Sequence, residues 1–311
     1  MNTATCKPSS ARPDVPPWLA SLVAMSLPLL FILLWSSGYV VGKVGLAHTD
    51  PLTLLSLRFG LAAGVLLLLA LLTGASWPRR AQDWGHLAVA GLLMQVLHFA
   101  GIYEAMRLGL PSGVAALLIG MMPLATALGA HLWLAERIGR WQAFGLLGGL
   151  LGVALVVAGK PLHGAGGWPA YAAALLGLSG LVLGTLYQKR FCAGMDLRSG
   201  SGVQMAVSAL TVTLLAAGFE GIEGFQALRW SGELLFATLW LGLVNSIGAF
   251  SLMFLMIRRG QAGRVAALFY LIPGVSALMG FAVLGEQLPP LALLGFAVSA
   301  IAVAVSAGKH R

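Results

Sequence analysis

The sequence predicts an all-α integral membrane protein with ten transmembrane helices, arranged as two inverted five-helix repeats. Three observations predict this fold class. Of the 311 residues, 59% are hydrophobic and only 9% are charged, whereas a soluble domain carries about 25% charged residues. The hydrophobic residues form long runs between short polar segments, as membrane helices require. Several motifs of the first half of the chain return in the second half.

The individual helices follow from the length of these runs, because an α-helix crosses the hydrocarbon core of a bilayer with about 20 residues. Residues 1–18 form a polar, proline-containing tail. The first run is too long for a signal peptide and lacks a convincing cleavage site, so we expect an uncleaved helix. In order, the predicted spans are 19–46, 51–73, 84–106, 111–134, 139–159, 168–189, 199–219, 233–257, 262–285 and 289–308.

Lysine and arginine predict the orientation of the helices, because cytoplasmic loops are enriched in both residues. With a cytoplasmic N-terminus, fourteen of the 19 basic residues fall in cytoplasmic segments, and only Arg107, Lys160 and Arg229 fall outside. The other two, Lys43 and Arg58, lie within spans. We therefore expect a multi-pass protein of the inner membrane with both termini in the cytoplasm.

The net charge of +9 is explained by basic residues in the cytoplasmic loops, so the expected partner is a lipid bilayer. The basic residues are not clustered with aromatic residues, so we expect no nucleic-acid partner. The two cysteines, Cys6 and Cys192, cannot form a disulfide framework and have no CxxC pattern or histidine beside them. The sequence contains no HExxH, GxSxG or nucleotide-binding loop, so we expect no metal, no cofactor and no enzymatic activity. An intramembrane enzyme and a channel are the alternatives from other classes.

The two halves of the chain repeat one another. GLPSGVAAL at 109–117 corresponds to GQAGRVAAL at 260–268, and Pro123 corresponds to Pro273. Half the chain contains five spans, an odd number, so the second copy enters the membrane upside down. This arrangement is typical of secondary transporters, whose substrate site lies between the repeats near the middle of the membrane. The first repeat is residues 19–159 and the second is 168–308. The two prolines are expected to break spans four and nine at the same depth.

Seven motifs follow one another along the chain: WSSGY (35–39), DPLTLLSLRF (50–59), SGVAALL (112–118), LAER (134–137), GLLGGLLG (145–152), VAALF (265–269) and LGEQ (284–287). In these motifs the chain resembles the EamA-type members of the drug/metabolite transporter superfamily. The resemblance implies a central cavity surrounded by spans 1, 3, 4, 6, 8 and 9, and an exporter of amino acids or other small metabolites. Carriers for another solute class, such as drugs or nucleotide-linked metabolites, are the alternative within the family.

Polar residues within spans are candidates for the substrate site, because they are costly in a bilayer. Gln95 and His98 lie near the middle of span three, almost on one face of the helix. The repeat aligns Gln95 with Ser246 of span eight, which follows Asn245. We predict that these four side chains bind a small-molecule substrate by hydrogen bonds, or else join helices. His98 is also the candidate proton carrier, since histidine titrates near neutral pH.

Charged and aromatic residues extend this prediction. Lys43 and Arg58 lie about two turns from the outer ends of their spans. They could attract a substrate carboxylate, pair with Glu104 or extend to the membrane surface. Trp35 and Tyr270 are the aromatic residues that we expect in the cavity wall. No acidic residue lies at mid-membrane in any span, which favours anionic or zwitterionic substrates over cations.

Two further features are expected to be structural. Glu136 and Glu286 end spans four and nine, where a carboxylate suits the N-terminal dipole of the next helix. The glycines of span five at 145, 148, 149 and 152 form overlapping GxxxG patterns. Such patterns allow close helix packing, either within the chain or in a homodimer.

Overall fold

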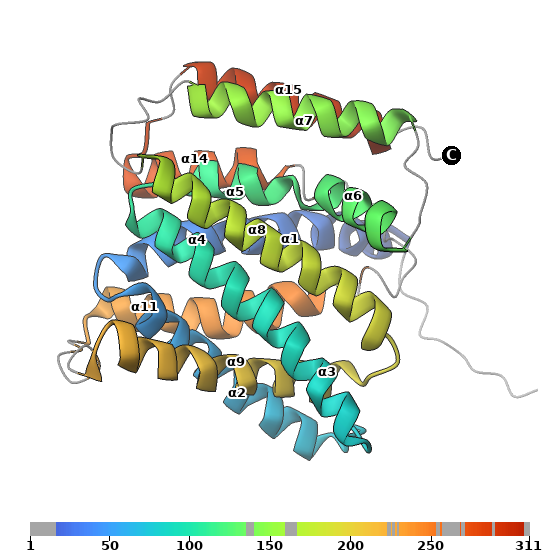
Figure 1. The fold of residues 1–311 in the computed structure, drawn as a ribbon, viewed down its shortest axis with the longest axis vertical. Helices are drawn as coiled ribbons and strands as arrows, with labels where there is room; N and C mark the ends of the chain where they lie inside the picture. Colours follow the sequence, from blue (N-terminus) through green and yellow to red (C-terminus); the bar gives the residue numbers. More distant parts are fainter. Residues whose placement is uncertain are drawn as a thin grey trace, which may run out of the picture.

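The computed structural model describes residues 17–134, 140–158, 167–222, 225, 228, 230–252, 256, 268, 271–287 and 290–307. Within these ranges every regular element is an α-helix or a π-helix (Figure 1). In chain order they are α1 (Pro17–Leu46), α2 (Pro51–Leu72), α3 (Ala81–Gly91), η1 (Leu92–Leu97), α4 (His98–Arg107), α5 (Ser112–Gly120), α6 (Met122–Leu134), α7 (Arg140–Ala158), α8 (Gly167–Phe191), α9 (Leu197–Phe219), α11 (Gly232–Leu239), η2 (Trp240–Ala249), α14 (Ile272–Leu284) and α15 (Pro290–Ala307). The first helix thus begins at Pro17, inside the predicted tail.

Six helical segments of the described chain are long and apolar enough to cross a membrane, and four further apolar segments are shorter. The six are 26–46, 51–72, 81–107, 167–191, 197–219 and 232–252. The shorter segments are 112–126, 143–152, 272–284 and 293–302. Together they follow the hydrophobic runs of the sequence, and the protein is a helical, multi-pass membrane protein.

Helices at corresponding positions of the two halves pack in matching pairs. α2 lies along α9, α5 against α14, and α7 against α15. α4 and η1 pack on α8, and α1 packs on η2 in the corresponding way. In Figure 1 the α7–α15 pair is at the top and the α2–α9 pair at the bottom, with the other helices between them.

Glycines allow the closest of these approaches. A Cβ atom at Gly101 of α4 would lie 2.6 Å from the Ala173 carbonyl oxygen of α8. A Cβ atom at Gly152 of α7 would lie 2.6 Å from the Gly295 carbonyl oxygen of α15. Gly148 and Gly152 of span five therefore allow α7 to pack closely on α15 within the chain. Since the lipid tails are as apolar as the helices, such close van der Waals packing is the main force that holds membrane helices together.

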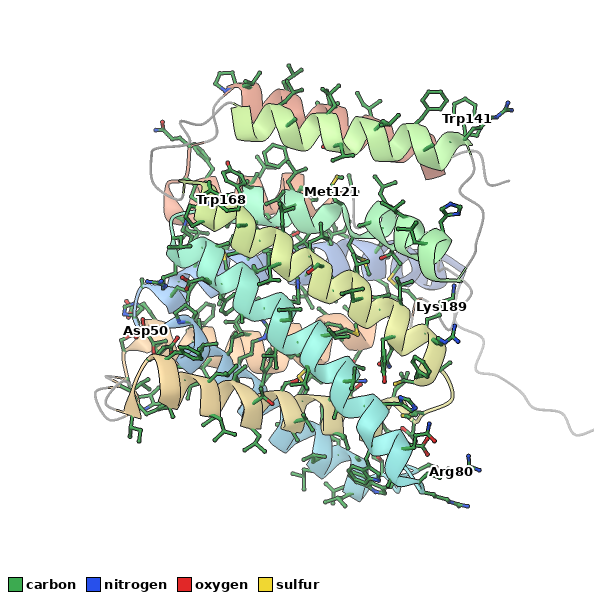
Figure 2. All side chains as sticks on the ribbon, viewed as in Figure 1. Asp50, Arg80, Met121, Trp141, Trp168 and Lys189 are labelled. Atoms are coloured by element: carbon green, nitrogen blue, oxygen red, sulfur yellow. The ribbon has the colours of Figure 1, made fainter. Side chains whose placement is uncertain are left out.

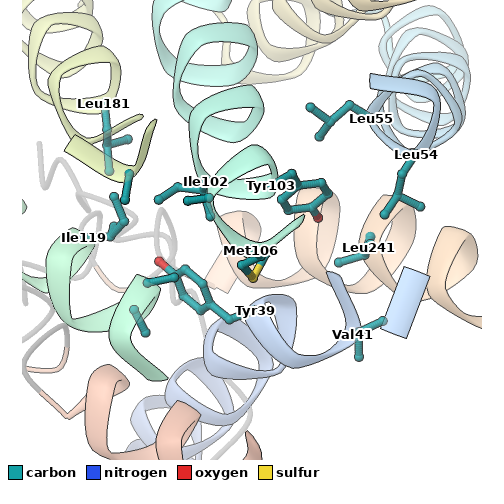
Figure 3. Packing of buried hydrophobic residues seen from close by; sticks show 14 of the residues in the cluster. Tyr39, Val41, Leu54, Leu55, Ile102, Tyr103, Met106, Ile119, Leu181 and Leu241 are labelled. Carbon is teal, nitrogen blue, oxygen red and sulfur yellow. The ribbon is translucent and has the colours of Figure 1, made fainter. Parts of the chain in front are cut away.

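The core lies where α1, α2, α4 and η2 meet (Figure 3). Leu54 of α2 and Leu241 of η2 are completely buried there, and Tyr103 of α4 is 1% exposed. Figure 3 shows the Tyr39 and Tyr103 rings within this apolar cluster. A buried tyrosine needs a partner for its hydroxyl group, so polar atoms are expected beside it.

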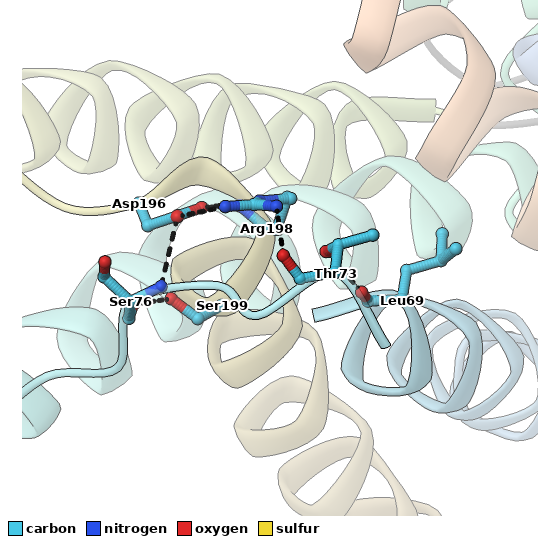
Figure 4. Close-up of polar contacts among 6 residues, drawn as sticks. All are labelled: Leu69, Thr73, Ser76, Asp196, Arg198 and Ser199. Carbon is cyan, nitrogen blue, oxygen red and sulfur yellow. Dashed lines mark hydrogen bonds and ion pairs between the residues drawn. The ribbon is translucent and has the colours of Figure 1, made fainter. Parts of the chain in front are cut away.

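The two ends of the helix bundle carry different polar and aromatic residues. Arg80, Trp141 and Lys189 lie toward one end of the molecule, and Asp50 and Trp168 lie toward the other (Figure 2). At the first of these ends, Asp196 is the N-cap residue of α9 and accepts a hydrogen bond from the backbone N–H of Arg198 (2.9 Å). Its carboxylate also accepts from the Ser76 N–H (3.2 Å), which ties the α2–α3 loop to α9 (Figure 4).

Candidate functional site

Spans three and eight are both π-helical in the middle. η1 contains Gln95, and η2 contains Asn245 and Ser246, so the two π-helices carry the residues that the repeat aligns. The Ser246 Oγ donates to the Leu241 carbonyl oxygen, five residues earlier (2.9 Å). A π-helix inserts an extra residue into a turn and occurs frequently at functional sites. The hydrophobic pattern does not reveal such an insertion, and the sequence analysis predicted plain α-helices here.

A small cavity of about 30 Å³ lies beside these segments. This volume accommodates about one or two water molecules and is much smaller than the pockets of about 300–1,000 Å³ that hold drug-sized ligands. A solute could therefore enter only if the helices separate. The cavity is lined by Trp35, Gly38, Tyr39, Arg58, His98, Phe99, Ile102, Tyr103, Asn245 and Phe250.

Arg58 is the charged member of this set, and it is 3% exposed. Its Nε donates to the Ser246 Oγ (3.0 Å), and its Nη1 donates to the Tyr103 hydroxyl (2.9 Å). The guanidinium carbon lies 4.0 Å from the centre of the Phe99 ring, which is cation–π distance. Arg58 thus connects α2 to α4 and η2 through uncharged partners.

Asn245 approaches α1 closely because residue 38 is a glycine. A Cβ atom at Gly38 would lie 2.6 Å from the Asn245 Nδ2. Nδ2 donates to the Leu34 carbonyl oxygen (2.8 Å). Since a carbonyl can only accept, this contact fixes the orientation of the amide group. The Asn245 Oδ1 is then left as a buried acceptor with no partner among the described atoms.

His98, which also lines the cavity, contacts α8. Its Nδ1 lies 3.0 Å from the Gly177 carbonyl oxygen. That carbonyl can only accept, so Nδ1 carries the hydrogen, and Nε2 is the acceptor of the neutral ring. The ring also packs edge-on against Phe99, with the ring centres 4.5 Å apart. His98 is thus held in a fixed orientation, as a substrate-binding or proton-carrying histidine would need to be.

The structure brings together Trp35, His98 and Asn245, three of the predicted substrate-binding residues. The other two in the described chain, Gln95 and Ser246, are buried but do not line the cavity. Tyr270 lies outside the described residues. Tyr103 and Phe250 take part in the wall, and the Trp35 and Phe250 rings lie 4.9 Å apart.

The predicted alternative that Lys43 or Arg58 pairs with Glu104 is wrong. Glu104 forms its ion pair with Arg107, three residues away on the same helix (2.5 Å), and not with Lys43 or Arg58. Lys43 pairs with Glu286 (2.5 Å), from a loop 243 residues later in the chain. Arg58 points into the core rather than to an outer surface. Pairing over so many residues could not be read from spacing along one helix.

Glu286 also has a different role from the one that we expected. Its carboxylate accepts hydrogen bonds from the Ser112 N–H (3.0 Å) and Oγ (2.7 Å). It therefore holds the N-terminus of α5, whereas the sequence analysis expected it to stabilise the helix that follows it. Burial opposes the charge of Glu286, but the hydrogen bonds from Lys43 and Ser112 outweigh this effect and lower its pKa. Its counterpart, Glu136, lies outside the described residues.

Both prolines lie at interruptions of a helix. α5 ends at Gly120, and α6 begins at Met122 after a turn at Met121, just before Pro123. Pro273 lies in the first turn of α14, after a turn at Leu271. Neither proline lines the small cavity. Pro273 instead lines a larger apolar space of about 260 Å³ between α5, α14 and α15.

Comparison with known proteins identifies the family. The sequence profile of the EamA-like transporter family matches residues 22–158 and again residues 168–308. The chain belongs to the EamA-like transporter family. Family membership makes this a transporter-type membrane protein in which one domain occurs twice.

Two relatives and one solved structure illustrate this EamA-like family membership. The chain is 29% identical to the inner membrane transporter YedA of Escherichia coli (strain K12), over 89% of each chain. It is 30% identical to a probable terminal-alkyne amino-acid exporter of Streptantibioticus cattleyicolor, over 87% of this chain and 88% of the relative. A crystal structure with 21% identity shares the fold, with a TM-score of 0.64 over 92% of this chain and 96% of that one.

Proposed function

We propose that this EamA-like protein is a secondary transporter that exports amino acids or related small metabolites across the inner membrane. Residues 19–159 and 168–308 would form two inverted halves of five helices each, with the N- and C-termini in the cytoplasm. The substrate site between the halves would face each side of the membrane in turn, without a cofactor. The names of the relatives as transporters favour transport over catalysis.

The observation that carries this proposal is the small cavity at the two π-helical segments. Trp35 and His98 come from the first half of the chain and Asn245 from the second, so both halves contribute to the cavity wall. A site between inverted repeats is what alternating access needs, because it is reached from one side or the other when one half tilts against its partner. The cavity volume, about 30 Å³, fits a closed state between these two openings.

The direction of the helices supports the inverted relation of the halves. α1 ends just before Asp50, and α8 begins with Gly167 and Trp168. Asp50 and Trp168 lie toward the same end of the molecule (Figure 2). α1 and α8, which open the two repeats, therefore run in opposite directions. The matching helix pairs, α4 on α8 and α1 on η2, agree with a two-fold relation between the halves.

Counterflow tests the proposal directly. Proteoliposomes loaded with a mixture of unlabelled L-amino acids are diluted into a trace of the same labelled mixture. A carrier accumulates label transiently, because its site returns loaded with solute, whereas a channel only equilibrates the label. Transient accumulation that is absent from protein-free liposomes is the expected result. Label that equilibrates without an overshoot would contradict a carrier, and conversion of the label to another compound would indicate an enzyme.

The inferred orientation is tested separately by tags. A reporter inserted between residues 160 and 168 should be accessible from outside the cell, and a reporter after Arg311 only from the cytoplasm. Reporters on the same side would contradict the inverted arrangement.

A further inference from the structure

Arg58 has an unusual environment for a buried cation. A guanidinium has five N–H donors. Arg58 donates one of them to Ser246 and one to Tyr103, and both of these partners are uncharged. Within the described ranges of the chain, no Asp or Glu forms an ion pair with it. Its side chain lines the cavity, so the unused donors lie beside a space that a solute could occupy.

Arg58 places a guanidinium group inside the protein, where it is 3% exposed. A buried charge is costly unless an opposite charge and hydrogen bonds compensate it. The Phe99 ring compensates part of the cost, since its centre lies 4.0 Å from the guanidinium carbon. A carboxylate would compensate the rest, and it matches the flat guanidinium with two parallel hydrogen bonds.

A second unused group lies on the same cavity. The Asn245 Oδ1 is buried and has no partner among the described atoms, and the residue as a whole is 6% exposed. It can only accept a hydrogen bond, so its natural partner is an N–H or O–H donor. The cavity therefore offers donors at Arg58 and an acceptor at Asn245, next to the aromatic rings of Trp35 and Phe250.

We propose that Arg58 binds the carboxylate of the transported solute while the Asn245 Oδ1 accepts a hydrogen bond from its amino group. This inference rests on the proposed transport function and specifies its substrate class, an α-amino acid or a close analogue with both groups. Ser246 and Tyr103 hold the guanidinium in place before the solute arrives, which lowers the entropy lost on binding. The aromatic rings contact the apolar part of the solute.

The competing explanation is that Arg58 only fastens α2 to α4 and η2. The two roles predict different effects of replacing Arg58 by lysine. Lysine keeps the positive charge but lacks the flat fork that binds a carboxylate at two points. A binding role therefore predicts that Arg58→Lys loses affinity for carboxylates even where the variant is folded. A fastening role predicts a lower unfolding temperature without any change in the choice between acids and amides.

The test measures thermal stabilisation of the purified protein by matched compounds, since a ligand that binds the folded state raises its unfolding temperature. The probes are L-leucine, L-phenylalanine and L-threonine, the amide of each, and 4-methylvalerate, which has the leucine carboxylate without the amino group. We expect at least one amino acid to stabilise the wild type and its amide not to. We expect Arg58→Lys to lower the affinity for that amino acid about tenfold or more. Arg107→Lys, on the exposed end of α4, should leave this affinity unchanged.

Each other outcome contradicts the proposal. Amides that stabilise as well as acids would exclude a carboxylate site, as would an unchanged affinity in Arg58→Lys. No stabilisation by any amino acid would exclude the substrate class. Stabilisation by 4-methylvalerate equal to that by L-leucine would exclude the role of Asn245. If Arg58→Lys does not fold, the acid and amide comparison on the wild type still decides. Counterflow of a different solute would then show that the transport function stands although this inference fails.

Discussion

Replacing Glu286 by glutamine removes the charge from a contact that joins three segments of the chain. The carboxylate binds Lys43 at the end of α1 and Ser112 at the start of α5, from the loop after α14. Glutamine has nearly the same size, so packing is preserved and the change isolates the charge. We expect Glu286→Gln to lower the stability of the folded protein because three donors lose a charged acceptor.

The size of the effect follows from these contacts. The Lys43 Nζ lies 2.5 Å from the carboxylate, the Ser112 Oγ 2.7 Å and the Ser112 N–H 3.0 Å. A hydrogen bond to a charged group contributes about 1.5–3 kcal/mol and a neutral one about 0.5–1.5 kcal/mol, so the loss is about 1 kcal/mol for each of three bonds. A total on the order of 3 kcal/mol corresponds to a fall of about 6 °C in the unfolding temperature.

The pH dependence of this effect has a definite sign. Glu286 has a lowered pKa in the folded protein, so its charge contributes stability above its ordinary pKa of about 4.3. That contribution is lost as the pH falls through the folded-state value, where the carboxylate takes up a proton. The difference in unfolding temperature between wild type and Glu286→Gln should therefore be complete at pH 7 and should narrow below about pH 4.

The assay is thermal unfolding of both purified proteins in one detergent, followed by tryptophan fluorescence from pH 7 down to about pH 3. Glu104→Gln is the matched control, since its ion pair with Arg107 is exposed (38% and 49% of the side chains). Exposed pairs contribute less than about 1 kcal/mol. If Glu286→Gln lowers the unfolding temperature no more than Glu104→Gln does, the contact does not hold this end of the molecule together.

Three other changes test other parts of the structure. Gly38→Ala would place a methyl group 2.6 Å from the Asn245 Nδ2, so we expect a loss of about 1–3 kcal/mol in thermal unfolding. Gly60→Ala, which meets nothing within 4 Å, is the control and should not destabilise the protein. Asp196→Asn should raise hydrogen exchange in residues 73–80 at constant pH, because Arg198 and Ser76 lose a charged acceptor. His98→Ala should abolish any pH dependence of counterflow; full transport with an unchanged pH profile would show that His98 carries no proton.

Much of the helical fold could be predicted from the sequence because the membrane imposes one strong constraint. Every backbone polar group must be satisfied inside its own segment, so apolar runs become helices and polar runs become loops. The predicted segment 51–73, for example, differs from α2 by only one residue. The duplicated motifs predicted two copies of one domain, and the family profile matches the chain twice.

The candidate site was harder to predict, because it depends on contacts between distant residues. Trp35, His98 and Asn245 were predicted from residue type and the repeat, and they line one cavity. Arg58 lies about two turns from the start of α2, as its spacing predicts. The spacing does not predict that its side chain points into the core, where it donates a hydrogen bond to Ser246, 188 residues later in the chain. Span three is π-helical at Gln95, which turns the side chains there away from the positions of a regular helix.

Two sets of buried polar groups in the described chain differ in their hydrogen bonds. Glu220 and Glu286 each accept hydrogen bonds from the N-terminus of a helix far away in the chain, α2 and α5 respectively. Near the cavity, by contrast, Arg58 keeps unused donors and the Asn245 Oδ1 has no partner among the described atoms. Buried polar groups are normally paired, so groups left unpaired need a reason other than stability. A solute that supplies the missing partners would therefore bind more tightly at the cavity.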